Sequence, residues 1–148
     1  MFSHILVPVD GSELSVTAGL RVIDLAKMCN AKLTTVLVSP TYKRMTDEGF
    51  VAPLVNKDSD RWKEKMSERA KRILGQVGTK AEDAGLKCKQ LHVFGDSPYL
   101  AIIDAANKNG CDAIVMGSHG LGGMKQFILG SETSRVLSHS KIPVLVYR

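Results

Sequence analysis

Long hydrophobic runs, paired cysteines and a charged leader are all missing from this 148-residue sequence. A membrane-spanning helix needs about 20 consecutive apolar residues, and no run approaches that length. The chain goes almost directly into the apolar residues Ile5, Leu6 and Val7, without a cationic segment or a cleavage site. This start predicts that no signal peptide is present. We therefore expect a cytoplasmic protein that does not insert into a membrane.

Cysteine is scarce, and Cys29, Cys88 and Cys111 lie far apart without a CxxC pair. An odd number without metal-ligand spacing favours reduced, buried thiols over disulfides or a metal site. Hydrophobic residues make up 44% of the chain and charged residues 24%, which is ordinary for a globular protein and excludes the disordered and fibrous classes. The length predicts one domain over residues 1–148.

The excess of positive charge is small, +5, and much of it lies between Lys57 and Arg72. A basic stretch can bind nucleic acid. Here four acidic residues alternate with the lysines and arginines. That pattern is typical of a solvated helix face with ion pairs four residues apart. We therefore expect no nucleic-acid partner.

Segments with strand and helix patterns alternate along almost the whole chain. Strand patterns cover residues 5–9, 32–38, 87–94, 112–116 and 142–147, and helix patterns begin after Ser12, near Asp58, at Pro98 and at Ser131. Ser12 and Ser97 have side chains suited to capping a helix. Because parallel strands need crossover connections, the alternation predicts an α/β fold with a doubly wound, mostly parallel sheet and helices on both faces. The connection 39–57 has no clear period and is long, which is typical of a functional or mobile segment.

Glycines concentrate in the segment 117–131, where five of the 13 glycines lie between a buried strand and the start of a helix. Glycine lets backbone N–H groups turn toward an anion, and the free N–H groups at a helix N-terminus also favour phosphate. Ligands of doubly wound sheets bind beyond the carboxyl ends of the strands, where this loop begins. We interpret the loop as a phosphate site to which Ser131 can donate a hydrogen bond. The alternative is a flexible loop in which Ser131 only caps the helix.

Two common phosphate motifs do not fit this loop. A Walker motif needs Gly-Lys followed by Ser or Thr, and neither Gly122 nor Gly123 precedes a lysine. The dinucleotide fingerprint needs a third glycine where Lys125 stands. The pattern is therefore that of neither a P-loop NTPase nor a usual Rossmann dehydrogenase.

The spacing Gly117-x2-Gly120-x9-Gly130-Ser131 resembles the ATP-binding signature G-2x-G-9x-G-(S/T) of the universal stress protein family. The resemblance covers almost the whole chain, including segments 5–12, 95–98, 112–117 and 142–146. It implies a single universal stress protein domain over residues 1–148, with a five-stranded parallel sheet in the order 3-2-1-4-5. It also implies ATP, together with Mg or Mn, across the gap between the first and fourth strands.

The same resemblance implies a nucleotide site on particular residues. It puts Asp10 near the ribose and phosphates, the backbone of Val38 at the adenine edge, and His119 near the phosphates. Asp10 can also act as a cap for the first helix, although its place at the end of the first strand favours contact with the ligand. The expected cofactor-binding residues are Pro8, Val9, Asp10, Val38, Met116, Gly117, His119, Gly120, Gly122, Gly123, Gly130, Ser131, Glu132 and Thr133. No residue is expected to be catalytic or to bind a metal directly.

The resemblance further implies a homodimer, because an apolar edge strand is usually covered and a two-fold axis can pair it with its copy. The residues expected at that interface are Pro143, Val144, Leu145 and Val146. Three functions stay open. An ATP-dependent stress-response regulator, read by an unknown partner protein, needs binding alone, whereas an ATPase or phosphotransferase needs a positioned base and metal ligands. A structural, stress-induced dimer with a non-catalytic nucleotide is the third. Because the sequence has no dense acidic cluster, it favours binding, with slow ATP hydrolysis at most.

Overall fold

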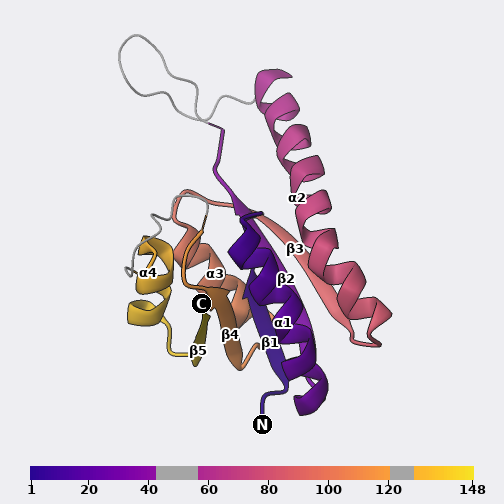
Figure 1. The fold of residues 1–148 in the computed structure, drawn as a ribbon. Coiled ribbons are helices and arrows are strands. Elements are labelled where there is room, and N and C mark those ends of the chain that lie inside the picture. The colour runs from indigo at the N-terminus through magenta and orange to yellow at the C-terminus, as the bar shows by residue number, and fades with distance from the viewer. Residues whose placement is uncertain (43–56, 121–128) are drawn as a thin grey trace.

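The structure, a computed structural model, describes residues 1–42, 57–120 and 129–148 and consists of alternating strands and helices (Figure 1). The strands are β1 (His4–Pro8), β2 (Lys32–Ser39), β3 (Cys88–Phe94), β4 (Ala113–Gly117) and β5 (Val144–Tyr147). The helices are α1 (Glu13–Cys29), α2 (Lys57–Asp83), α3 (Pro98–Lys108) and α4 (Ser131–His139). Each boundary falls close to the position that the hydrophobic periodicity predicts. Of the connection 39–57, Ser39 belongs to β2 and Lys57 to α2, and residues 43–56 lie outside the described residues.

All five strands pair in parallel in the order β3-β2-β1-β4-β5, which confirms the expected sheet. The β1–β2 pairing runs along all of β1, from His4 opposite Lys32 to Pro8 opposite Val36. In contrast, β1 and β4 pair only at Ile5 and Leu6. Strands β1, β2 and β3 form one half of the sheet and β4 and β5 the other, so the strand order reverses between β1 and β4. In doubly wound sheets this is the point where a ligand crevice opens.

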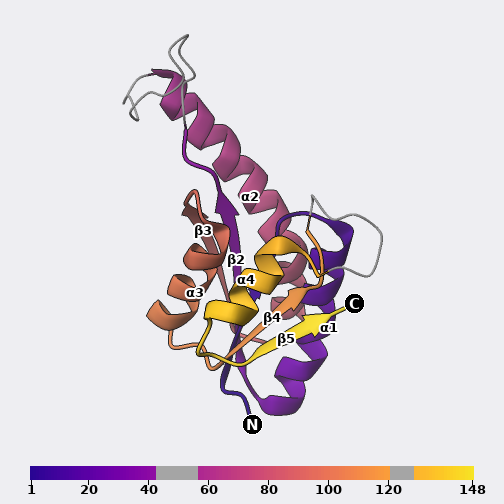
Figure 2. The same cartoon turned by 90° about the vertical axis from the view of Figure 1, so that its left-hand side faces the viewer.

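Helices cover both faces of the sheet, as the alternation predicts. Helices α1 and α2 lie on one face and α3 and α4 on the other (Figure 2). Neighbouring residues of β1 therefore enter different cores: Val7 packs with Val22 and Val77, whereas Leu6 packs with Ile102 and Val136. Strand β4 is buried along its whole length, as expected for a continuously apolar strand with helices on both sides.

The predicted cap at Ser12 is confirmed, but the one at Ser97 is wrong. The Ser12 side chain accepts a hydrogen bond from the Ser15 backbone N–H at 3.2 Å. Ser97 stands at the N-cap position of α3 without a side-chain hydrogen bond to the helix. Instead, α3 is capped by a carboxylate from another helix: Glu132 Oε2 accepts a hydrogen bond from the Tyr99 backbone N–H at 2.9 Å. A local sequence pattern cannot show such a long-range partner.

Helix α2 is long and extends past the end of the sheet (Figure 1). In the N-terminal part of α2, Trp62 contacts the segment that follows β2: its Nε1 donates a hydrogen bond to the Pro40 carbonyl oxygen at 3.4 Å. Across the described ranges, no helix combines the length and apolar character needed to cross a membrane. All three cysteines are free thiols, and Cys111 is buried.

Candidate functional site

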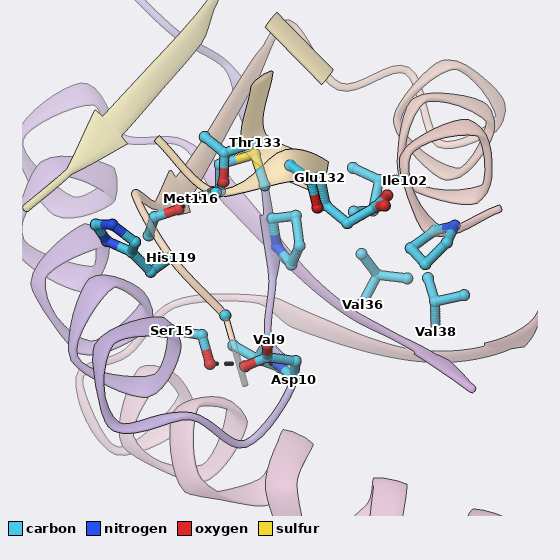
Figure 3. Close-up of a pocket in the computed structure, with 16 residues that line it drawn as sticks. Val9, Asp10, Ser15, Val36, Val38, Ile102, Met116, His119, Glu132 and Thr133 are labelled. Atoms are coloured by element: carbon cyan, nitrogen blue, oxygen red, sulfur yellow. Dashed lines mark hydrogen bonds between the residues drawn. The ribbon is translucent and has the colours of Figure 1, made fainter. Parts of the chain in front are cut away.

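A cavity of about 340 Å³ opens at the carboxyl ends of β1, β2 and β4, next to the point where β1 and β4 stop pairing. This volume is within the range of small-molecule sites, roughly 300–1,000 Å³. The strands supply Pro8, Val36 and Met116 to its wall, while α3 and α4 supply residues near their N-terminal ends (Figure 3).

Most of the residues expected to bind a nucleotide line this one cavity. These are Pro8, Val9, Asp10, Val38, Met116, Gly117, His119, Gly120, Gly130, Ser131, Glu132 and Thr133. The expected residues Gly122 and Gly123 lie outside the described residues, as does Lys125. Segments more than 100 residues apart in the sequence therefore meet at one end of the sheet.

Four lining residues were missed by the sequence prediction: Ser15, Val36, Pro98 and Ile102. Val36 could have been found, because it lies two residues before Val38 and side chains two apart on a strand share a face. Pro98 and Ile102 lie one helical turn apart on α3. Nothing in their local pattern says that α3 reaches the carboxyl end of β2, so only the packing places them here.

Asp10, in the turn after β1, is held by hydrogen bonds to the turn itself, to α1 and to α2. Asp10 Oδ1 accepts the Ser12 backbone N–H at 2.9 Å, and the Asp10 backbone N–H donates to Ser15 Oγ at 3.2 Å. From α2, Arg69 Nη2 donates to the Asp10 carbonyl oxygen at 3.0 Å. One carboxylate oxygen of Asp10 thus makes a local bond to the N-cap residue of α1. The other oxygen, Oδ2, lies on the side of Gly120.

Gly120 and Gly130 stand where a Cβ atom would be crowded by neighbouring atoms. A Cβ atom on Gly120 would overlap Oδ2 of Asp10, and one on Gly130 would lie 3.0 Å from the Ser118 carbonyl oxygen. The Gly130 backbone N–H donates to that same carbonyl at 2.7 Å. Gly130 is also the N-cap of α4, which makes Ser131 the first residue of the helix rather than its cap. The exposed Ser131 side chain lines the cavity.

His119 is in the cavity wall, but its ring is turned to one side. Figure 3 shows the ring at the edge of the site, on the side away from Val38. Its Nδ1 shares a hydrogen bond of 2.9 Å with Ser118 Oγ. Its Nε2 is buried and has no hydrogen-bond partner within residues 1–42, 57–120 and 129–148. A ring nitrogen of this kind can take a ligand or solvent partner.

The first turn of α4 forms hydrogen bonds with β4 and with α3. Thr133 is 3% exposed, and its Oγ1 donates to the Gly117 carbonyl oxygen at the end of β4, at 2.9 Å. Glu132 joins α4 to α3 through the Tyr99 N–H, and its Oε1 accepts from Arg135 Nη1 at 3.1 Å. These bonds fix the N-terminus of α4 at the cavity.

The cavity has two chemically different ends. Val36, Val38, Pro98 and Ile102 form an apolar end between β2 and α3. The polar end contains the Asp10 turn, the glycines and the N-terminus of α4. In Figure 3, Val36 and Val38 lie well apart from the Ser15 hydroxyl and the His119 ring. Such a site suits a molecule with a flat apolar part and an anionic part, because helix N-termini attract anions.

Comparison with known proteins identifies relatives over the full length of the chain. Universal stress protein MJ0577 of Methanocaldococcus jannaschii is 31% identical over 100% of this chain and 96% of its own. Universal stress protein YxiE of Bacillus subtilis is 30% identical and covered completely in both chains. A solved structure of MJ0577 superposes with a TM-score of 0.82, at 32% identity, over 99% of this chain and 95% of that chain.

Two solved structures of the same fold contain a nucleotide. One is a universal stress protein in complex with cAMP, with a TM-score of 0.71 and 24% identity over 99% of this chain and 97% of that chain. The other is the universal stress protein from Archaeoglobus fulgidus in complex with dAMP. It has a TM-score of 0.69 and 20% identity, and it covers 99% of this chain and 98% of that chain. The model of the universal stress protein family matches residues 1–148. By this match and by its full-length relatives, the chain belongs to the universal stress protein family.

Proposed function

We propose that the cavity binds ATP and that the protein acts as a nucleotide-dependent regulator or sensor in a stress response. The observation that carries this proposal is the two-ended cavity at the switch point between β1 and β4. Its apolar end accommodates the base and its polar end the ribose and phosphates. Binding, rather than fast turnover, is the function proposed, in the cytoplasm and with a partner protein that responds to the bound nucleotide.

The described residues fit the parts of an adenine nucleotide. At the apolar end, Val36 and Val38 face Pro98 and Ile102 from another element, which leaves a slot for a planar ring. At the polar end, the positive end of the α4 dipole and the Ser131 hydroxyl favour the phosphates, and Mg or Mn enters with them. Because Gly120 has no side chain, the Asp10 carboxylate can lie against its backbone at the polar end.

The nucleotide complexes of the related proteins support this proposal. The two nucleotides in those complexes, cAMP and dAMP, share an adenine base, a sugar and a phosphate with ATP. In this chain the cavity lies at the fold position that doubly wound proteins use for ligands, and its apolar and polar ends match the chemical character of those groups. ATP adds two phosphates, which we place beyond the N-terminus of α4.

A homodimer through β5 is part of the proposal. Strand β5 lies at one edge of the sheet, and Leu145 on it is 36% exposed. An apolar edge strand is a ready template for pairing, and a two-fold axis lets the same strand of a second copy cover it. We place Pro143, Val144, Leu145 and Val146 at that interface.

Ser131→Asp tests the phosphate position without disturbing the fold. An acidic residue in the first turn of a helix is favourable by about 0.3–1 kcal/mol, so the variant should fold at least as stably as the parent protein. The new carboxylate repels phosphate. Thermal unfolding is followed with and without ATP and Mg²⁺, since a ligand at 100 times its Kd stabilises a protein by about 2.7 kcal/mol. We expect this ATP-dependent stabilisation to be lost.

Ser138→Asp is the matched control. Ser138 is also an exposed serine of α4, but it lies near the other end of the helix. The control adds the same charge and should retain the full ATP-dependent stabilisation. If Ser131→Asp responds to ATP as the parent protein does, the phosphates do not lie at the N-terminus of α4 and the proposed site is wrong.

A further inference from the structure

The geometry points to Glu132 as the residue that selects the base: its carboxylate accepts a hydrogen bond from a 6-amino purine and rejects a 6-oxo purine. This inference rests on the proposed nucleotide function and adds a specificity determinant to it. Glu132 follows directly after the Gly130-Ser131 pair, yet its side chain reaches across to the first turn of α3. In Figure 3 it lies beside Ile102 rather than beside Asp10 and Ser15.

The Glu132 carboxylate is held in a fixed place at the apolar end. Oε2 accepts the Tyr99 backbone N–H at 2.9 Å, and Oε1 accepts from Arg135 Nη1 at 3.1 Å. Arg135 is itself positioned over the Tyr99 ring, with Cζ 5.7 Å from the ring centroid. The two bonds come from different helices, so the carboxylate cannot swing freely. A positioned acceptor discriminates between ligands better than a mobile one.

Glu132 has acceptor capacity beyond these two bonds. An ionised carboxylate has about four lone-pair positions, and the two bonds to Tyr99 and Arg135 use two of them. The Glu132 side chain is 34% exposed, and the residue lines the cavity. In Figure 3 the nearest labelled side chain is that of Ile102, and Val36 and Pro98 also line this end of the cavity; none of the three has a polar side chain. The carboxylate therefore adds a hydrogen-bond acceptor to the apolar end of the cavity.

The chemistry of the two purine classes differs at the position that such an acceptor reads. Adenine has an amino group at C6, which donates a hydrogen bond to a carboxylate. Hypoxanthine has a carbonyl oxygen there, which only accepts and would face the negative charge. A site built around a hydrogen bond discriminates against the analogue that leaves the buried partner unpaired. Glu132 therefore favours the adenine nucleotide over the hypoxanthine nucleotide.

Binding of ATP and of inosine triphosphate, measured by calorimetry, tests this inference because the two ligands differ only at the C6 substituent and at the neighbouring N1, which carries a proton in hypoxanthine. The parent protein is compared with Glu132→Gln, whose amide oxygen can still accept the Tyr99 N–H. We expect ATP to bind the parent protein on the order of tenfold more tightly than inosine triphosphate. The glutamine amide can donate to a 6-oxo group as well as accept from a 6-amino group. In Glu132→Gln the preference should therefore fall to about onefold to threefold.

Asp104→Asn is the matched control for charge. Asp104 is an exposed carboxylate of α3, paired with Lys108 at 2.8 Å and not part of the cavity wall. This variant makes the same change in net charge and should keep the preference of the parent protein. An unchanged preference in Glu132→Gln overturns the inference, and so does an equal change in the affinity for both ligands, which would place the carboxylate at the ribose or phosphates. If the parent protein binds neither ligand, the proposed function itself fails, and that result is visible before any variant is made.

Discussion

At the scale of single residues, the contact between Gly120 and the Asp10 carboxylate links the two sides of the candidate site. Gly120→Ala would place a Cβ atom against Oδ2 of Asp10. The carboxylate is the end of a side chain and can move, so we expect little loss of stability. A displaced carboxylate would lose the contact with the ribose that we propose for it, and we expect ATP affinity to fall about tenfold, or ~1.4 kcal/mol. Calorimetry and thermal unfolding measure the two effects separately.

Gly75→Ala is the control for a glycine without such a contact. Gly75 lies inside α2, and a Cβ atom there would meet nothing within 4 Å. Replacing a helical glycine by alanine raises stability by about 0.5–1 kcal/mol. This variant should be more stable and bind ATP normally. Equal ATP affinity in Gly120→Ala and Gly75→Ala would show that the Asp10 carboxylate has no part in binding.

Protonation of His4 should lower the free energy of unfolding as the pH falls. Burial, and then the positive charge of Lys32, lower the pKa of His4 from its ordinary value of 6.5. Its Nε2 shares a hydrogen bond of 2.8 Å with Thr34 Oγ1. Below pH 6.5 the unfolded chain therefore binds more protons than the folded one, so the contribution of His4 is complete above pH 6.5 and is lost as the pH falls. Burial also lowers the pKa of His92, which adds to the same decline.

Urea denaturation at pH 7.5, 6.5 and 5.5 measures this decline. We expect the free energy of unfolding to decrease over this series. In His4→Gln the decrease should be smaller, because glutamine does not titrate and can still bond Thr34. Identical pH profiles of the parent protein and the variant would exclude His4 as a source of the decline.

At the scale of secondary-structure elements, the bond from Thr133 to Gly117 sets where α4 begins relative to β4. Thr133→Val keeps the shape of the side chain but leaves the Gly117 carbonyl without its donor. We expect a loss of about 1–3 kcal/mol in the free energy of unfolding. Because the N-terminus of α4 then shifts, ATP affinity should fall too. Thr133→Ser retains the hydroxyl and should retain most of the affinity, and equal affinities in the two variants would contradict the role given to this bond.

The elements themselves could be predicted from the sequence, but part of their arrangement could not. Periodicity located the strands and helices, and the alternation of strands and helices predicted a parallel sheet with helices on both faces. The capping of α3 failed as a prediction because Glu132 is 33 residues from Tyr99 in the chain. Pro98 and Ile102 were missed for the same reason. Their place in the cavity depends on how α3 packs on β2, which neighbouring residues do not encode.

In the candidate site, too, the residues that follow a local sequence pattern could be predicted, and those placed by long-range packing could not. The glycine spacing and the end of β1 predicted the polar end, including Asp10, Gly120 and Gly130, which line the cavity. The apolar end was predicted only at Val38. Hydrophobic residues that line a ligand slot have the same pattern as residues of the core, so the sequence alone does not separate them.

At the scale of the whole molecule, the proposed homodimer depends on the edge strand β5. Leu145→Lys would put a charge on this strand, and charged side chains on an edge strand oppose pairing with another strand. Leu145 is 36% exposed in the isolated chain, so we expect the fold to be retained. Sedimentation at micromolar concentration should give a dimer for the parent protein and a monomer for the variant. A monomeric parent protein would contradict the proposal.

Nucleotide binding by the intact protein is the central claim, and a calorimetric titration with ATP and Mg²⁺ tests it most directly. The nucleotide recovered afterwards is checked for ADP, which separates binding from turnover. We expect saturable binding of one ATP to each chain, with the ATP recovered unchanged. Steady release of ADP would contradict a binding function and indicate an enzyme. The absence of binding would contradict the claim that this cavity is a nucleotide site.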